Sequence, residues 1–300
     1  SELSVRELVK RCARRILLIV GSAMLLWSGD SRIALAQEKA SADFNFAYAS
    51  FFGTGWYKID NDREAFVIRA APRWEMTEAS LDEKGNRQVG YSFRVPVTIG
   101  LARLNFDDIP GIIDAENFSS TSIGLAFDAD IPINERWSLR PGAELGYASV
   151  IDDSPYAWTY RVEVRARYRI EANRLNWALI GGLGVVGNVP NDASSEYFSF
   201  ASIAAEFEHP TRWSTRAGKP LFFYSHLSYT DHLDEVEFGA GSQALQSLGS
   251  FWQLGGSLGR DNDPIRIWRF NFDRLGLGYN YSTSSEFRGI KLFFRSLYEL

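Results

Sequence analysis

The sequence predicts an all-β protein, a transmembrane antiparallel β-barrel of about 12 strands. From Phe44 to Leu300 the chain repeats stretches in which apolar and polar residues alternate. Aromatic residues make up 14% of the chain although its mean hydropathy is −0.19. This combination is typical of strands that face lipid on one side and a polar lumen on the other.

The clearest alternation covers residues 160–171. Tyr160, Val162, Val164, Ala166, Tyr168 and Ile170 share one parity, and Arg161, Glu163, Arg165, Arg167, Arg169 and Glu171 share the other. Because successive side chains of a strand point to opposite faces, one face is apolar and the other ionic. A soluble secreted β-sandwich binding protein, with the apolar face in its core, is an alternative that this pattern leaves open.

The N-terminal residues predict export. Arg11, Arg14 and Arg15 precede an apolar run over residues 16–27, and Ala34-Leu35-Ala36 follows as a small-x-small cleavage site. This order is typical of a secretory signal peptide. We therefore expect residues 1–36 to be removed and residues 37–300 to form one barrel domain.

The mature chain is acidic. Residues 1–36 hold six of the 32 Lys and Arg and three of the 37 Asp and Glu, so the remainder has a net charge near −8. This charge argues against a nucleic-acid partner. Cys12, the only cysteine, lies inside the predicted signal. No phosphate-binding loop, dinucleotide fingerprint or zinc motif is present, so we expect neither cofactor nor metal.

Alternation and turn residues together place the strands. They are expected near residues 44–57, 64–76, 89–103, 117–130, 137–149, 157–170, 174–187, 196–208, 220–230, 248–260, 265–280 and 286–300. The last strand offers Ile290, Leu292, Phe294, Tyr298 and Leu300 to lipid. Trp56, Tyr57, Trp74, Trp137, Tyr147, Trp158, Tyr160, Trp177, Trp268 and Tyr298 are expected in interfacial girdles.

The expected connections set the orientation. If the first strand runs outward, residues 134–136, 171–173 and 261–264 form short periplasmic turns, as such barrels show. The long segments 104–116 and 231–247 then lie outside. Two further periplasmic connections, residues 77–88 and 209–219, are long for such turns.

Three segments resemble the solitary outer-membrane autotransporter β-barrel family. They are Phe51-Phe52-Gly53-Thr54-Gly55-Trp56-Tyr57, Val95-Pro96-Val97-Thr98-Ile99-Gly100 and Ile131-Pro132-Ile133-Asn134-Glu135-Arg136-Trp137-Ser138-Leu139-Arg140-Pro141. The resemblance covers residues 44–300. It implies a twelve-stranded barrel in the outer membrane of a Gram-negative bacterium, inserted by the barrel-assembly machinery and surrounded by lipid. It carries no catalytic residues, and because only residues 37–43 precede the first strand, we expect no passenger.

Parity places a basic set of side chains in the lumen. The lumen or pore candidates are Arg94, Arg140, Arg161, Arg165, Arg167 and Arg169. Arginine rings favour anions by their field, which predicts a path for small anionic solutes. The alternative is that these charges pair across strands and fill the barrel, because eight strands give a packed interior and sixteen or more a channel. The expected role is a small channel or an envelope structural protein.

One pair predicts a different chemistry. His226 and Ser228 share a strand face, so the imidazole could act as a base for a serine nucleophile, with Glu235 or Glu237 as the orienting group. The His-x-Ser spacing is similar to that of outer-membrane phospholipases and lipid A deacylases, although Tyr229 stands where those families usually have Asn. A lipid-acting serine hydrolase is therefore an alternative, and we expect a protein that is not an enzyme.

Overall fold

The computed structural model describes residues 51–58, 64–82, 85–103, 118–149, 156–172, 175–191, 195–215, 218–233, 249–260, 265–267 and 270–298. The chain divides into two units, Ser1–Lys39 and Ala40–Leu300, and every described residue belongs to the second. The predicted signal peptide therefore lies outside the described residues.

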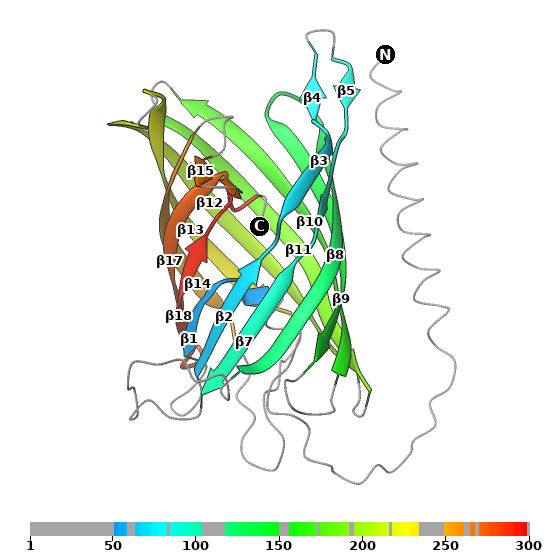
Figure 1. The fold of residues 1–300 in the computed structure, drawn as a ribbon. Coiled ribbons are helices and arrows are strands. Elements are labelled where there is room, and N and C mark those ends of the chain that lie inside the picture. Colours follow the sequence, from blue (N-terminus) through cyan, green and yellow to red (C-terminus); the bar gives the residue numbers. More distant parts are fainter. Residues whose placement is uncertain are drawn as a thin grey trace. The chain divides into compact units, whose positions relative to one another are not determined.

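Twelve crossing strands form a closed antiparallel barrel (Figure 1), which confirms the predicted fold class. The strands are β1 (Gly55–Lys58), β2 (Glu64–Ala70), β3 (Arg73–Thr77), β4 (Ser80–Leu81), β5 (Arg87–Gln88), β6 (Gly90–Arg94), β7 (Val97–Arg103), β8 (Phe118–Pro132), β9 (Trp137–Ser149), β10 (Tyr156–Ala172), β11 (Leu175–Pro190), β12 (Glu196–Ser214), β13 (Pro220–His232), β14 (Phe251–Gly259), β15 (Ile265–Ile267), β16 (Phe270–Phe272), β17 (Arg274–Ser282) and β18 (Arg288–Phe293).

The sheet closes between its first and last strands. Its fourteen strands have the order β3-β6-β8-β7-β2-β1-β18-β17-β14-β13-β12-β11-β10-β9, and β8 also pairs with β9. Two crossings consist of two pieces each, β2 with β3 and β6 with β7, so the number of crossings is twelve. The register of β1 on β18 places Gly55 opposite Lys291 and Trp56 opposite Ile290. Closure pairs the strand edges that would otherwise be open.

Two prolines divide the second and third crossings, which the sequence predicted as continuous strands. Pro72 and Pro96 both lie in the break between the β2–β7 and β3–β6 ladders, offset from each other by one position. Proline has no N–H to donate to a ladder. The neighbouring backbone groups still pair, because Val95 N donates to Pro72 O at 3.1 Å and Gly124 N donates to Pro96 O at 2.9 Å.

The wall alternates between outward apolar and inward polar side chains, as the sequence predicted. Leu125 on β8 and Leu145 on β9 are 59% and 56% exposed on the outer face. Their inward neighbours Asp128 and Glu144 are 4% and 8% exposed. The core of this protein therefore lies in the lumen and includes many charged groups.

The first and last strands are shorter than predicted. β1 begins at Gly55, so residues 51–54 do not extend it, and β18 ends at Phe293 rather than continuing to Leu300. The physical reason is the same at both ends, because these segments turn into the lumen and bury aromatic side chains there. Residues 44–50 and Leu300 lie outside the described residues.

The connection between β14 and β17 contains a small hairpin where the sequence predicted one strand over residues 265–280. Within this connection β15 pairs with β16, and the barrel strand β17 starts only at Arg274. Ile-Arg-Ile and Phe-Asn-Phe alternate as a crossing strand does, so periodicity could not separate the two arrangements. The predicted turn at residues 261–264 lies outside the described residues.

Strand extensions explain the two connections that were long for turns. In the first, β4 and β5 prolong the hairpin, and Asn86 N donates to Asp82 Oδ1 at 2.6 Å in its turn. In the second, β12 runs on to Ser214, which leaves only residues 215–219 before β13. The short turn before β9 is held by Asn134, whose Oδ1 accepts hydrogen bonds from the backbone N of Arg136 and Trp137.

Several tryptophans lie on the outer face of the barrel, whereas two of the tyrosines predicted for the girdles do not. Trp74, Trp137 and Trp158 are 53%, 43% and 51% exposed. Tyr57 and Tyr298 are each 1% exposed and point inward, so their predicted contact with lipid is wrong. Among the described residues, no helix is long and apolar enough to cross a membrane.

Candidate functional site in the barrel lumen

A cluster of buried aromatic side chains lies inside the barrel, at the end where β13 ends and β14 begins. We call it the aromatic plug, and it consists of Phe51, Phe52, Tyr57, Phe198, Phe200, Phe251 and Phe287. The Phe51 ring meets those of Phe198 and Phe200 edge to face, with centroids 5.3 and 5.0 Å apart. Phe52 stacks on Phe287 at 5.2 Å. Each such contact contributes about 0.5–1.5 kcal/mol beyond burial.

Three local features hold the plug segment in place. The Tyr57 hydroxyl donates to the backbone carbonyl of Phe52 at 2.6 Å. The Thr54 hydroxyl donates to Arg69 O at 2.8 Å and accepts from Arg69 N at 2.9 Å. Gly53 has φ of +74°, in the left-handed region that glycine enters without steric cost. The chain thus turns from the lumen into β1.

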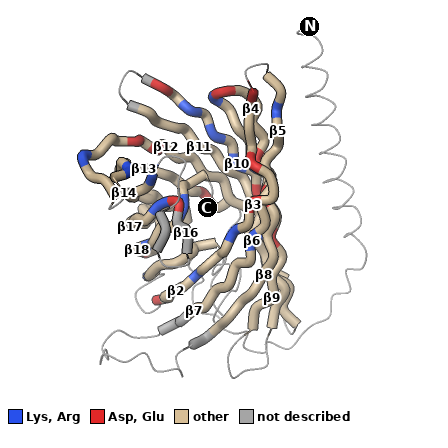
Figure 2. The backbone as a smooth tube through the Cα atoms, turned by 45° about the horizontal axis from the view of Figure 1, so that its top comes forward, with Lys and Arg blue, Asp and Glu red and all other residues tan. Residues whose placement is uncertain are grey.

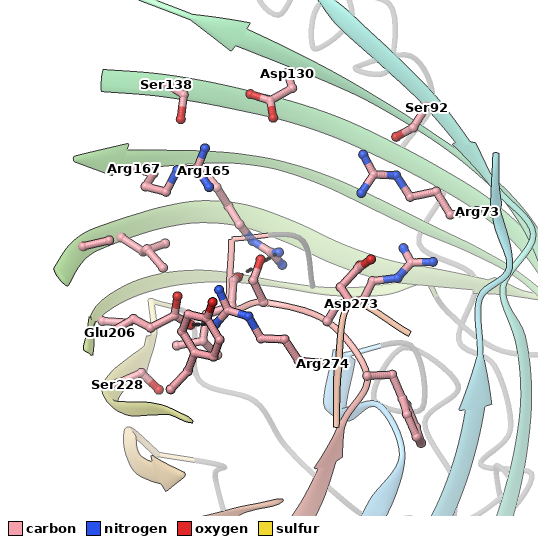
Figure 3. Close-up of a pocket in the computed structure, with 18 of the residues that line it drawn as sticks. Arg73, Ser92, Asp130, Ser138, Arg165, Arg167, Glu206, Ser228, Asp273 and Arg274 are labelled. Atoms are coloured by element: carbon pink, nitrogen blue, oxygen red, sulfur yellow. Dashed lines mark hydrogen bonds and ion pairs between the residues drawn. The ribbon is translucent and has the colours of Figure 1, made fainter. Parts of the chain in front are cut away.

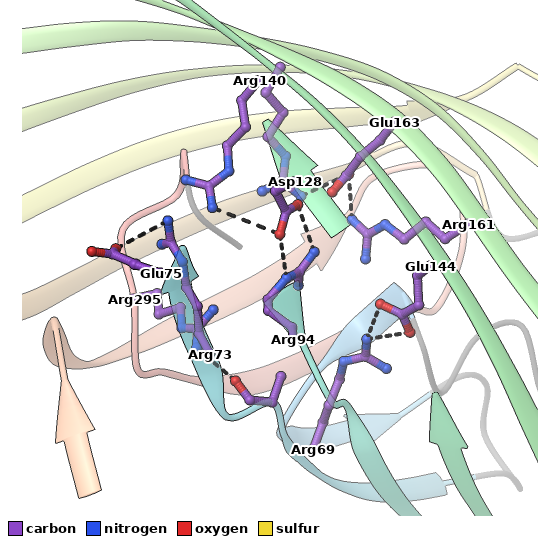
Figure 4. A network of polar contacts seen from close by, with 12 residues as sticks. Arg69, Arg73, Glu75, Arg94, Asp128, Arg140, Glu144, Arg161, Glu163 and Arg295 are labelled. Carbon is purple, nitrogen blue, oxygen red and sulfur yellow. Dashed lines mark hydrogen bonds and ion pairs between the residues drawn. The ribbon is translucent and has the colours of Figure 1, made fainter. Parts of the chain in front are cut away.

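Buried ion pairs line the inner wall of the barrel (Figure 4). Arg94 donates two hydrogen bonds to Asp128, of 2.7 and 2.9 Å, and the Arg140 guanidinium lies 3.9 Å from the same carboxylate. Arg94 and Asp128 have side chains only 8% and 5% exposed. Bidentate pairing of this kind is stronger and more directional than a single hydrogen bond.

Two further carboxylates extend these pairs into a network. Glu144 on β9 accepts two hydrogen bonds of 2.7 Å from Arg69 on β2, and the strands β7 and β8 lie between these two strands. Glu163 lies between Arg161 and Arg165, at 2.7 and 2.9 Å. We call these eight residues the arginine network: Arg69, Arg94, Arg140, Arg161 and Arg165 with Asp128, Glu144 and Glu163. Figure 2 marks basic residues on several strands around the barrel, among them β2 and β10.

The C-terminal residues after β18 enter the lumen as a tail. The Tyr298 hydroxyl donates to Asp130 at 3.1 Å, and the Arg167 guanidinium lies 4.1 Å from the centre of the Tyr298 ring. Burial raises the pKa of Tyr298 to about 12, so the hydroxyl keeps the proton that it donates. Arg295 donates to Ala71 O at 2.7 Å. These contacts hold the tail against two different walls.

Replacing Tyr298 by alanine is expected to release the tail, because the ring supplies both the contact with Arg167 and the bond to Asp130. Limited trypsin digestion of the folded barrel should then cut after Arg295, which the wild-type fold protects. Tyr298→Phe is the matched control, since it keeps the ring and loses only the hydroxyl. Equal cleavage of wild type and Tyr298→Ala would contradict this role of the ring.

A cavity of about 1740 Å³ occupies the rest of the lumen (Figure 3). Its floor includes Phe51 and Phe251 of the aromatic plug, and its rim includes Ser80 and Asn134 at the opposite end. Arg165 and Arg167 extend into it from β10, Arg73 from β3, Arg274 from β17 and Glu206 from β12, and Asp273 extends into it from the residue before β17. Among the described residues, no three His, Cys, Asp or Glu side chains are grouped to hold a metal ion.

The structure places all six predicted lumen arginines on the inner face. Arg94 and Arg140 are 6% and 4% exposed and belong to the arginine network, as do Arg161 and Arg165. Arg167 contacts Tyr298, and Arg169 is an exposed residue that lines the cavity. Four of the six therefore lie beside carboxylates, Arg94 and Arg140 across neighbouring strands and Arg161 and Arg165 within their own strand.

The structure does not join His226 to Ser228 by a hydrogen bond. His226 is 4% exposed, its ring packs edge to face on Phe293 at 4.9 Å, and its Nε2 has no partner among the described residues. Ser228 lines the cavity. The candidate orienting residues Glu235 and Glu237 lie outside the described residues.

Sequence analysis missed the two inward segments. Alternation continues through both, because Phe51 and Phe294 stand at positions that also suit a strand. One signal was present at the C-terminus, where Ser296 occupies the parity assigned to lipid and Tyr298 follows it. A polar residue in a lipid-facing row is a reason to end the strand before it.

Comparison with solved structures identifies the fold. No protein-family model matches the chain, and a search of curated proteins found no match either. The translocator domain of autotransporter NalP from Neisseria meningitidis matches at 8% identity, with a TM-score of 0.53 over 79% of this chain and 83% of that one. The β domain of the Bordetella autotransporter BrkA matches at 10% identity and a TM-score of 0.51, over 80% and 94%. The chain is therefore an autotransporter-like β-barrel domain in its fold.

Proposed function

We propose that this chain is a non-enzymatic barrel of a Gram-negative outer membrane. The outer face supports this location, because large apolar side chains such as Leu254, Ile203 and Leu183 are 64%, 59% and 56% exposed on it. Exposing so many apolar side chains to water is unfavourable, whereas lipid accepts them. Tryptophans at strand ends fit the interfacial girdles of such barrels.

The cavity is proposed to open toward the periplasm. β7 ends and β8 begins at the end of the barrel that holds the aromatic plug, as do β13 and β14, and the long connections of residues 104–117 and 234–248 join these strand ends. The opposite end carries the short turns after β8 and β10. Short turns belong on the periplasmic side of outer-membrane barrels and long loops on the outer side. The plug then faces outward.

The aromatic plug is the observation that supports the functional proposal. A lumen closed by packed rings does not conduct, so the resting protein is a closed barrel of the envelope. When the plug leaves, the arginine-lined lumen becomes a small channel that favours anions. Two measurements test the proposal. Density-gradient separation of bacterial membranes shows which membrane holds the protein, and single-channel recording of the full chain in a planar bilayer shows whether it conducts. Outer-membrane location with no resting current supports the proposal, and a protein soluble without detergent contradicts it.

Replacing Ser228 by alanine tests the non-enzymatic part of the proposal. We expect the lipid composition of outer membranes to be the same with Ser228→Ala as with the wild type, since no hydrogen bond prepares this hydroxyl as a nucleophile. Mass spectrometry of phospholipids and lipid A from matched strains is the measurement, with a strain lacking the protein as reference. A lipid change made by wild type and lost in Ser228→Ala would favour the hydrolase.

A further inference from the structure

One lumenal cation has no counter-ion in the described part of the chain. Lys291 on β18 lines the cavity, and none of the described carboxylates lies within ion-pair distance of its ammonium. It interacts electrostatically with Arg69, Arg161 and Arg165, and with the carboxylate of Glu163. The aliphatic stem of Lys291 lies beside Gly53, next to the aromatic plug.

The charges around Lys291 are unbalanced. The arginine network holds five guanidinium groups and three carboxylates. Lys291 adds a sixth cation, so these nine described side chains include three more basic than acidic groups. The side chains of Arg69, Arg161 and Arg165 are 10%, 12% and 12% exposed. Charge of one sign in so sheltered a place is costly, because little water is present to screen it.

We propose that Lys291, Arg69, Arg161 and Arg165 form a binding site for a multivalent oxyanion of the phosphate type. Guanidinium groups match phosphate oxygens through paired hydrogen bonds, and lysine adds a point charge. A polyvalent anion balances the excess charge in one event, whereas a single chloride ion leaves most of it. Lys291, Arg69, Arg161 and Arg165 all line the cavity, so the site is reached through its open end.

This site extends the proposed function by naming the class of anion that the lumen binds. It rests on the proposed function in one respect, that the open end of the cavity faces the periplasm. Binding does not require the plug to leave. The two proposals therefore fail separately. A wild type that conducts at rest contradicts the closed barrel, and a silent barrel that binds no oxyanion contradicts the site.

Isothermal titration calorimetry tests the site. Pyrophosphate is titrated into the full chain in detergent, in a buffer low in chloride. We expect saturable binding of one pyrophosphate per barrel. Lys291→Gln should weaken it by at least about tenfold, the loss expected for one charged hydrogen bond. Arg169→Gln is the matched control, because it removes the same charge from an exposed residue lining the cavity outside the site, and should change affinity by less than about threefold.

Melting temperature gives a second readout on the same samples. Lys291→Gln removes repulsion from three arginines, so we expect it to fold and to melt above the ligand-free wild type. Pyrophosphate should raise the melting temperature of wild type and of Arg169→Gln, and leave Lys291→Gln nearly unchanged. Absence of saturable binding to the wild type, or equal weakening in Lys291→Gln and Arg169→Gln, would overturn the site.

Discussion

Replacing Phe51 and Phe52 together by serine is expected to turn a silent barrel into one that conducts in discrete steps. Phe51 meets Phe198, Phe200 and Phe251 across the lumen, and Phe52 stacks on Phe287. Serine keeps the backbone turn at Gly53 but removes the rings that exclude water. Because the side chains beneath are rich in arginine, the open steps should favour anions.

Single-channel recording in a planar bilayer under a salt gradient measures both effects, the conductance and the reversal potential. The double variant Phe51→Leu with Phe52→Leu is the matched control, since it keeps apolar bulk and should remain closed. Heat-modifiable gel migration verifies that each variant is folded. Continued silence of the serine variant would show that the rings of Phe51 and Phe52 are not what closes the lumen.

Replacing Asp128 by alanine is expected to destabilise the barrel by about 3–5 kcal/mol, the usual effect of removing one partner of a buried ion pair. Asp128 is 4% exposed and receives two hydrogen bonds from Arg94. Without it, Arg94 and Arg140 are left close together with no carboxylate between them. The loss comes mainly from this uncompensated buried charge.

Unfolding by urea in lipid vesicles, followed by tryptophan fluorescence, measures the change in the free energy of unfolding. Glu75→Ala is the matched control, because Glu75 pairs with Arg73 at 3.3 Å but is 61% exposed. An exposed pair contributes about 0–1 kcal/mol. Equal effects of the two variants would contradict the importance of burial for this network.

The two halves of the prediction about lumen charges had different outcomes. Alternation placed Arg94, Arg140, Arg161 and Arg165 inside, and the structure confirms that orientation. Alternation alone could not show whether these arginines form a ring that faces a water-filled lumen or ion pairs with carboxylates. That choice depends on which carboxylates the strand register brings opposite each arginine, and Arg69 and Glu144 are 75 residues apart.

The inward segments show a limit of local pattern. Phe51 and Tyr298 each continue a plausible strand, yet both leave the wall to bury rings in the lumen. The lumen exists only after twelve strands have closed, so no local window of sequence contains the surface that attracts these rings. The same holds for Lys291, whose arginine neighbours come from β2 and β10.

The sequence by itself determined the fold class, the number of crossings and which side of each strand faces inward, because these depend on a two-residue period that every strand repeats. Only the tertiary structure decided where strands end, which charges pair and which segments turn into the lumen. Those features depend on contacts across the barrel between residues far apart in the chain. Their energies are set by burial and charge balance, which exist only once the barrel has closed.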